Sequence, residues 1–282
     1  MRTLSKQQDK LWLIIWLAGL GCLALWDAAF LNRPSFNLVL TAALNTALAC
    51  TLVIVCSMGL GWMAGVGLYF LETRHRSLYL AATFLLNIIR SFPQIIGALV
   101  GYVVLTLLIE NDILKSRLAQ LSWMALVIAL VVFLEVVDLV RERIGYYSRL
   151  DFFQAMLSCG IKESRIVNKE ILWKNSRAHL LQKLVSIAGV AIFLQCSIDF
   201  VVSVGLSTDV SLSNFPVTLG SLLAKLDSKQ DILAIGTTIV RLDNVSSLLF
   251  QHLQGISIAL IIVFSLVCLY NISNGLVKRF NL

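Results

Sequence analysis

Long hydrophobic runs separated by short polar segments dominate the pattern of this chain. Six runs are long enough to cross a membrane, since a helix needs about 20 apolar residues to pass a hydrocarbon core roughly 30 Å thick. They lie at about 11–31, within 38–70, from Pro93 to about 109, and at about 120–140, 184–204 and 255–273. The pattern predicts an all-α, polytopic membrane protein with six transmembrane helices.

One further apolar stretch, at 78–89, is too short to span a bilayer unaided. We expect it to be a lead-in helix that is broken from the third span at Pro93, because proline disrupts a helix interior. The second span contains Gly61 and Gly65, a G-x-x-x-G pair. Such a pair lets helix backbones approach closely, so we expect it to pack against another helix.

Composition supports the membrane prediction. The chain is 58% hydrophobic and 14% charged, with a mean hydropathy of +0.85, whereas ordinary soluble proteins are about 25% charged. A soluble core of this size cannot bury so much apolar surface. This excludes a soluble enzyme, a disordered protein and a secreted disulfide scaffold as interpretations. The first run is expected to be a retained span, because no small-residue cleavage site follows it.

The basic residues predict an orientation. With six spans, both termini lie on one side, and that side carries sixteen Lys and Arg against six on the other. Lys and Arg accumulate on the cytoplasmic side of membrane proteins. We therefore expect a multi-pass protein of the lipid bilayer with both termini in the cytoplasm. The net charge of +7 is interpreted as this orientation signal, and no nucleic-acid partner is expected.

A long polar connection, at about 141–183, separates the fourth and fifth spans. It keeps helical periodicity, with apolar or small residues at three- and four-residue steps. These are Leu150, Phe153, Met156, Leu157, Gly160 and Ile161, followed by Ile166, Val167 and Ile171. The pattern predicts one or two short amphipathic helices below the membrane. Their apolar face either packs on the membrane domain or docks into a groove of a soluble partner.

The same connection resembles the coupling loop of permease subunits of ATP-binding-cassette importers, which carries the pattern E-A-A-x3-G-x9-I-x-L-P. The strict matches are Ala155, Gly160 and Leu172. The substituted positions are Gln154 for Glu, Met156 for the second Ala, Glu170 for Ile and Trp173 for Pro. Arg141 followed by Asp151–Met156 resembles the fuller form of the peptide and nickel importers, an Arg and then D-Y-V-E-A-A.

Four further blocks resemble the family in its order along the chain. They are Ser91-Phe92-Pro93 for A-F-P, 201–207 for L-S-F-L-G-L-G, 216–223 for P-x-W-G-x-M-L, and 271–276 for N-L-L-G-D-G-L with one residue missing. The chain is thus similar to a divergent second (C-type) permease of the dipeptide, oligopeptide and nickel transporters. The resemblance implies a type I importer fold in a bacterial inner membrane.

The resemblance also implies a division of the chain. Residues 1–37 would form a cytoplasmic lead and the first transmembrane helix. Residues 38–282 would form the permease core, with a coupling loop at about 141–183 and an external segment at about 207–254.

A transporter subunit, and no enzyme, is what the resemblance implies. Together with a homologous second permease, the chain would form the path of a peptide-like or chelated-metal substrate. Two ATPase subunits and an extracytoplasmic substrate-binding protein would complete the complex. The chain has no G-x-x-x-x-G-K-[ST] sequence and no paired His/Cys ligand set. We therefore expect no metal site and no cofactor in it, with ATP and Mg²⁺ bound by the partner ATPases.

In this family the loop helix sits in a cleft of the ATPase. Here the acceptor face would be Phe153, Ala155, Met156 and Leu157. Gly160 would end the helix, because glycine accepts the left-handed conformation needed at a C-cap. The full set of implied coupling residues is Arg141, Asp151, Phe153, Gln154, Ala155, Met156, Leu157, Gly160 and Leu172.

Charged residues within the spans leave other functions open, because a charge at the bilayer centre costs at least about 2.5–3.5 kcal/mol. Glu135, Asp138 and Arg141 fall near one helix face. They form either an interfacial ion-pair cluster or the proton relay of an ion-driven secondary carrier. Asp199, with Pro93, is a candidate for the translocation path. Asp199 could meet a cationic substrate, pair with Arg90, or cap a neighbouring helix.

Two more alternatives stay open. One is an ATP-binding-cassette complex that exports a cationic solute. The other is an assembly or scaffold protein of the membrane. The sequence does not separate these from the importer.

Overall fold

The computed structural model describes residues 7–205, 215–225 and 253–280, and within these ranges the chain is helical, with no strand. The expected all-α class is confirmed. The helices are α2 (Gln8–Phe30), α3 (Arg33–Arg74), α4 (Arg76–Ser91), α5 (Gln94–Glu110), α6 (Arg117–Tyr147), α7 (Asp151–Ser158), α8 (Glu163–Arg165), the π-helix η1 (Ile166–Asn175), α9 (Arg177–Gly205), α10 (Leu219–Lys225) and α13 (Leu253–Phe280). Most of the expected external segment, 207–254, lies outside the described residues.

Five helices are long and apolar enough to cross a membrane: α2, α3, α6, α9 and α13. The pair α4 and α5 adds a sixth crossing only if the two helices are taken as one broken span, because they meet at an angle of 89°. The break falls at Pro93, as expected: α4 ends at Ser91, and Pro93 caps the start of α5. A polytopic helical membrane protein is therefore the class that the fold supports.

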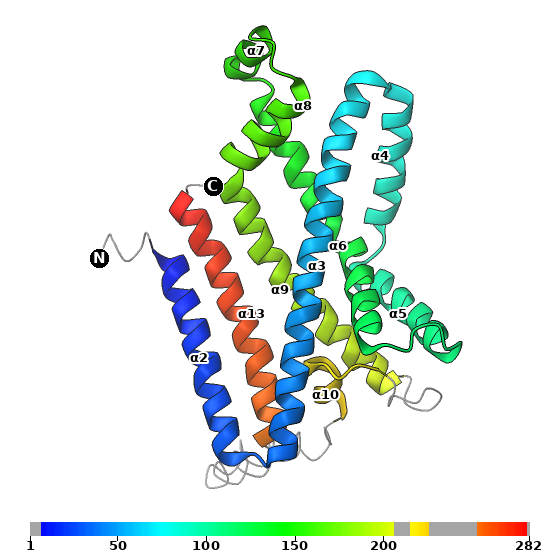
Figure 1. The fold of residues 1–282 in the computed structure, drawn as a ribbon, viewed down its shortest axis with the longest axis vertical. Helices are drawn as coiled ribbons and strands as arrows, with labels where there is room; N and C mark the ends of the chain where they lie inside the picture. Colours follow the sequence, from blue (N-terminus) through cyan, green and yellow to red (C-terminus); the bar gives the residue numbers. More distant parts are fainter. Residues whose placement is uncertain (1–6, 206–214, 226–252, 281–282) are drawn as a thin grey trace.

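The described ends of the chain lie next to each other. The Arg279 guanidinium of α13 pairs with the Asp9 carboxylate of α2 at 2.7 Å, so the two helices run antiparallel, side by side (Figure 1). α7 lies at one end of the molecule and α10 at the other (Figure 1). We call these the α7 end and the α10 end. The start of α2 and the end of α13 both lie toward the α7 end (Figure 1).

The interface between α3 and α6 forms the centre of the bundle. A β-carbon built on Gly61 would lie 2.4 Å from Cβ of Val136, and one built on Gly65 would lie 2.7 Å from Cγ1 of Val140. The expected close packing of this glycine pair is confirmed. Burial also places α6 at the centre: 56% of the residues in its most apolar window are buried inside the protein, against 6% for α2. α6 is thus central, and α2 is peripheral.

α3 is much longer than one span requires. Its 42 residues extend over about 63 Å at 1.5 Å per residue, about twice the thickness of a hydrocarbon core. The end of α3, together with α4, the end of α6 and α7, rises beyond the ends of α2 and α13 (Figure 1). These elements project from the bundle at the α7 end.

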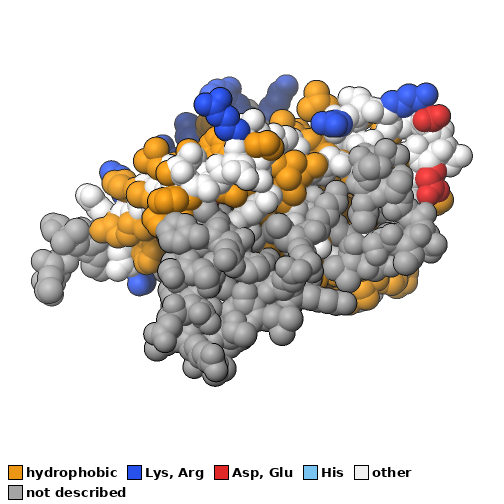
Figure 2. All heavy atoms as spheres, turned by 90° about the horizontal axis from the view of Figure 1, so that it is seen from below, with side chains coloured by type: hydrophobic (Ala, Val, Ile, Leu, Met, Phe, Trp, Pro, Cys, Tyr) orange, Lys and Arg blue, Asp and Glu red, His pale blue; other side chains and the backbone are white. Residues whose placement is uncertain are grey.

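A second, smaller hydrophobic core lies at the α10 end. Buried residues of α3, α9, α10 and α13 form it: Val39, Ala42, Cys196, Leu219, Leu222, Ile258 and Ile262. Seen from this end, the described side chains are mostly hydrophobic or uncharged, and charged side chains lie at the rim (Figure 2).

Candidate functional site

The first candidate site is the segment between α6 and α9. It is shorter than the expected 141–183, because α6 continues to Tyr147 and α9 already begins at Arg177. A helical segment at this place is confirmed. α7 is its first helix and has Asp151 in its first turn, where a carboxylate is favourable beside the positive end of the helix dipole.

Gly160 ends α7 in the way that the sequence predicts. Its φ is +75°, which is the left-handed region. The Gly160 N–H bonds to the Leu157 carbonyl at 2.9 Å, and the Ile161 N–H bonds to the Met156 carbonyl at 3.2 Å. These two bonds form a Schellman motif, which stops a helix and satisfies its last carbonyls.

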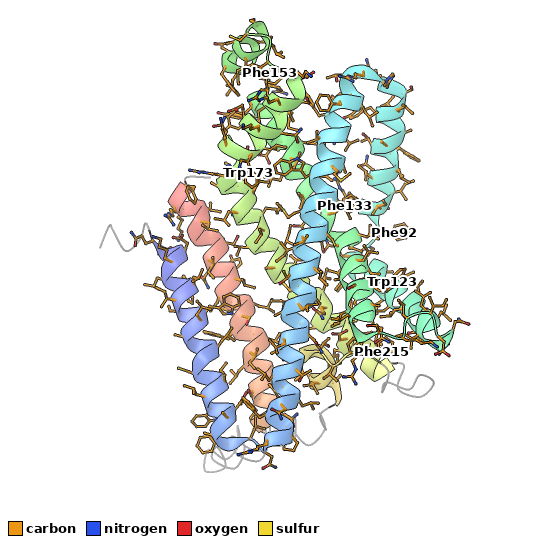
Figure 3. The ribbon with its side chains drawn as sticks, in the orientation of Figure 1. Phe92, Trp123, Phe133, Phe153, Trp173 and Phe215 are labelled. Atoms are coloured by element: carbon orange, nitrogen blue, oxygen red, sulfur yellow. The ribbon has the colours of Figure 1, made fainter. Side chains whose placement is uncertain are left out.

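The expected docking face of α7 needs a correction. Phe153 is 4% exposed and points from α7 into the protein (Figure 3), and Met156 and Leu157 pack against the same core. Apolar side chains at this spacing anchor α7 to its own chain. The exposed face consists of Asp151, Gln154, Ala155, Ser158 and Cys159, so of the expected acceptor residues only Ala155 lies fully on it.

η1 replaces the second expected α-helix with a π-helix. Ile166 and Val167 are completely buried, and so are Ile171 and Leu172 five residues later. A π-helix, whose bonds join residues five apart, places both pairs on one face. The Ser176 N–H bonds to the Ile171 carbonyl at 2.9 Å and closes this pattern. Leu172 therefore anchors η1 in the core, and Trp173 beside it is 70% exposed.

Two hydrogen bonds from α3 hold α8 and η1. The Tyr69 hydroxyl donates to Oε1 of Glu163 at 2.7 Å, and the Trp62 indole N–H donates to Oδ1 of Asn168 at 2.8 Å. Tyr69 and Trp62 are seven residues apart, or two helical turns, so they lie on one face of α3. The projecting segment is thus fastened to a membrane helix at two points.

Arg141 points toward α4. Its guanidinium donates to the Tyr79 hydroxyl at 2.7 Å and lies over the Tyr79 ring, 5.7 Å from the centroid. Arg141 also lines an open cavity of about 860 Å³ between the ends of α3 and α6, which reaches Arg149 and Leu150 just before α7. The arginine thus connects the neighbourhood of α7 with α4.

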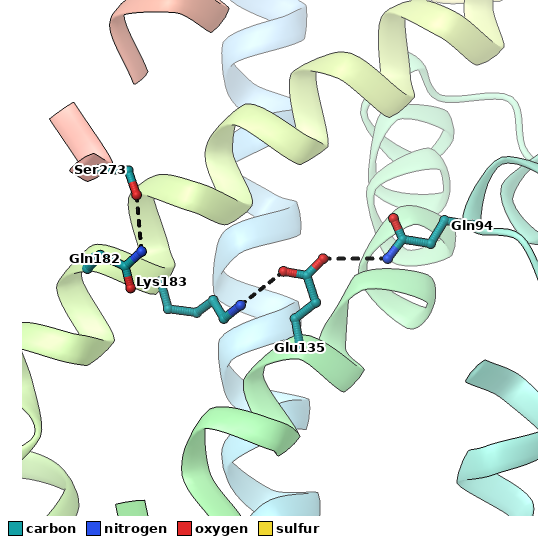
Figure 4. A network of polar contacts seen from close by, with 5 residues as sticks. All are labelled: Gln94, Glu135, Gln182, Lys183 and Ser273. Carbon is teal, nitrogen blue, oxygen red and sulfur yellow. Dashed lines mark hydrogen bonds and ion pairs between the residues drawn. The ribbon is translucent and has the colours of Figure 1, made fainter. Parts of the chain in front are cut away.

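The second candidate site is a layer of polar side chains that crosses the bundle (Figure 4). Glu135 of α6 accepts hydrogen bonds from Nζ of Lys183 on α9, at 3.1 Å, and from Nε2 of Gln94 on α5, at 3.5 Å. Next to Lys183, Nε2 of Gln182 donates to Oγ of Ser273 on α13 at 3.2 Å. The layer therefore joins four helices at one level.

Asp138 extends this layer to the bend between α4 and α5. Its carboxylate pairs with Arg90 of α4 at 2.7 Å. Arg90, Asp138 and Glu135 line a cavity of about 390 Å³, whose wall includes Pro93 and Gln94. Both acids form ion pairs, as expected, but with Lys183 and Arg90; Arg141, which was expected to share their cluster, bonds to Tyr79 instead. The two acids contact both sides of the Pro93 break: Asp138 contacts Arg90 before it, and Glu135 contacts Gln94 after it.

Asp199 belongs to a different, deeply buried group at the α10 end. It is 4% exposed, and it accepts hydrogen bonds from the Tyr102 hydroxyl at 3.0 Å and the Thr218 hydroxyl at 2.5 Å. Thr218 immediately precedes α10. Asp199 thus lies at the start of a neighbouring helix, which fits the expected capping role. It does not pair with Arg90, which pairs with Asp138 instead.

Sequence reasoning missed several of these residues. Trp62, Tyr69 and Tyr102 lie in apolar spans, where an aromatic residue gives no sign of a polar contact. Lys183 was counted with the loop, although α9 already begins at Arg177. No signal in the sequence marks it, because Lys183 lies just before the apolar run at 184–204.

The fold and these sites define a polytopic helical membrane protein with a projecting helical segment and a polar layer inside its bundle. No protein-family model matches the sequence, and no curated protein matches it. Among the residues described, His, Cys, Asp and Glu side chains form no group of three or more that could hold a metal ion.

Proposed function

We propose that this chain is the membrane-spanning subunit of an ATP-binding-cassette transporter in a bacterial inner membrane. It pairs with a homologous second permease to form the path of a peptide-like or chelated-metal substrate. Two ATPase subunits supply the energy, and an extracytoplasmic protein delivers the substrate. Both termini, and with them the α7 end, face the cytoplasm.

One observation carries the proposal: the construction of α7. Buried Phe153 fixes this eight-residue helix to the bundle, and Gly160 stops it by a left-handed C-cap. Its opposite face, with Gln154 and Ala155, is left exposed. A short helix that is rigidly held on one side and free on the other suits docking into a groove of a partner.

Affinity purification from native membranes in mild detergent tests the proposal, with mass spectrometry of the bound proteins. We expect a second permease and ATPase subunits to be recovered. Ala155→Arg places a charged, bulky side chain on the exposed face and should remove the ATPase subunits while the second permease stays. Ser77→Arg, at an exposed position on α4 at the same end, is the matched control and should keep both. Recovery of the chain alone in several detergents would sink the proposal.

Gly160→Pro tests the end of α7 itself. Proline fixes φ near −65°, which is incompatible with the observed +75°. We expect transport to be lost while the protein stays in the membrane. Normal transport by both this variant and Ala155→Arg would exclude a coupling role for α7.

The polar layer favours a second candidate, an ion-driven secondary carrier. Glu135, Asp138 and their cationic partners surround the Pro93 break beside a cavity, and acids in such a place can carry protons. This candidate predicts transport that depends on the proton gradient, continues without ATP and is lost in Glu135→Gln. Transport that stops on ATP depletion while the gradient is maintained would exclude it.

A further inference from the structure

The first turn of α10 is attached to α3. The backbone N–H of Leu219 donates to the Thr46 hydroxyl at 3.0 Å, and Nδ2 of Asn45 donates to the Val217 carbonyl at 2.7 Å. Thr46 is 3% exposed. The two bonds hold both sides of Thr218, the residue that precedes the helix.

The same turn is attached to α9. The Thr218 hydroxyl donates to the Asp199 carboxylate, while it accepts the Ser221 N–H at 3.2 Å, and the Ser221 hydroxyl accepts the Thr218 N–H at 2.9 Å. This reciprocal pattern is that of a capping box. Below it, a β-carbon on Gly220 would lie 2.6 Å from Cα of Cys196, so no side chain separates α10 from the α9 backbone.

The same two helices hold η1 at the α7 end. η1 continues into α9 after Ser176, and α3 binds Asn168 of η1 through Trp62 and Glu163 of α8 through Tyr69. Tyr69 and Thr46 are 23 residues apart on one uninterrupted helix, a distance of about 35 Å along its axis. α3 and α9 therefore share one contact partner at each end.

We propose that α3 and α9 couple the position of η1 to the attachment of α10 at the opposite end. Trp62 and Tyr69 set how α3 lies against η1 at one end, and Thr46 and Asp199 hold the first turn of α10 between α3 and α9 at the other. An axial shift of α3 relative to α9 separates Thr46 from Asp199. Because Thr218 and Leu219 are bonded to both helices, α10 cannot follow both and loosens from one of them.

The coupling rests on the proposed function in one respect: there, ATPase-driven movement of α7 and η1 supplies the shift. Trp62, Tyr69, Thr46 and Asp199 are positioning residues in this scheme.

Native cysteines provide the readout. Cys196 is 9% exposed and lies under Gly220, so loosening of α10 uncovers it. The full chain in phospholipid nanodiscs is alkylated with N-ethylmaleimide, and mass spectrometry follows each cysteine separately. Cys268, buried in α13, reports general loosening, and the exposed Cys159 of the projecting segment reports reagent activity.

Tyr69→Phe combined with Trp62→Phe removes both donors at the α7 end and keeps the rings. We expect at least a threefold faster alkylation of Cys196, with Cys268 unchanged. The control is Thr73→Val, which removes a hydroxyl on the same end of α3 that bonds only within its own helix. Thr46→Val should accelerate the alkylation of Cys196 directly. When it is combined with the two aromatic substitutions, the alkylation rate should rise by less than the sum of the separate increases.

Two results would overturn the coupling. One is a Cys196 rate equal to wild type in the double aromatic variant. The other is a parallel rise at Cys268, which would show general loosening instead. The assay contains neither ATP nor ATPase subunits, so its failure leaves the purification test of the transporter unaffected. A positive result without recovered ATPases would keep the coupling and reject the transporter.

Discussion

The polar layer and the α10 end bury acidic side chains in different ways. In the polar layer, Glu135 pairs with Lys183 and Asp138 pairs with Arg90, and the acid side chains are 29% and 54% exposed. Toward the α10 end, Asp199 and Asp27 are 4% and 2% exposed. Their hydrogen bonds in the described part of the chain come from hydroxyl groups: Tyr102 and Thr218 for Asp199, and Ser257 for Asp27.

This difference indicates different mechanical roles. Ion pairs to the long, flexible side chains of Lys183 and Arg90 tolerate small displacements, because these side chains can follow the carboxylates. A buried carboxylate with short hydroxyl donors tolerates little, because each donor that loses it stays unsatisfied. We therefore interpret the polar layer as the adaptable region and the α10 end as the rigid one, whose hydrogen bonds break when the helices that carry them shift.

Asp199→Ala should have the largest effect on this comparison. It leaves the buried Tyr102 and Thr218 hydroxyls without an acceptor, and each such loss costs about 1–3 kcal/mol. We expect the free energy of unfolding, measured by denaturing-detergent titration of the full chain, to fall by about 2–6 kcal/mol. Asp138→Ala is the matched control and should cost less than about 1 kcal/mol. Equal losses of unfolding free energy for the two acids would remove the distinction between the polar layer and the α10 end.

Glu135→Gln should have an intermediate effect. The amide can still accept a hydrogen bond from Gln94, but Lys183 loses the carboxylate that neutralises it, at a cost of about 1 kcal/mol. Lys183→Met in the same chain should restore part of the loss, because the unpaired charge is then gone. The measurement is the same titration, arranged as a double-mutant cycle. A cycle without coupling energy would show that the pair does not join α6 to α9.

Arg90→Gln should have the smallest effect, below about 0.5 kcal/mol, as expected for an exposed ion pair. Arg90 is 47% exposed and Asp138 54%. Added salt should shrink the difference from wild type further, because it screens exposed charges. A loss as large as that of Asp199→Ala would mean that the α4–α5 bend depends on this pair.

The sequence predicts the features of this fold that depend on local chemistry. Apolar length placed the helices, Pro93 broke α4 from α5, and the left-handed requirement identified Gly160 as the end of α7. The spacing of Gly61 and Gly65 predicted close packing, although its partner α6 became known only from the structure. Each of these features follows from residues that are close together in the sequence.

Features that depend on tertiary contacts could not be predicted in this way. Ile166, Val167 and Ile171 fit an α-helical period about as well as a π-helical one, and only the buried surface that receives them decides. Periodicity assigned Phe153 to an apolar face of α7 without showing whether that face meets a partner or the chain's own core. For Asp199, three roles were compatible with the sequence, because its donors come from distant residues.

The bend at Pro93 also has a consequence for how the chain is made. α5 has 17 residues, at the lower limit for a membrane-spanning helix, and α4 carries Arg76 and Arg90 at its two ends. Neither segment is a strong insertion signal by itself as it leaves the ribosome. The Glu135 and Asp138 side chains that receive Gln94 and Arg90 are translated later, with α6. We therefore expect this region to settle into the bilayer only after α6 has been synthesised, so a nascent chain that stops before α6 would leave it exposed to quality-control proteases.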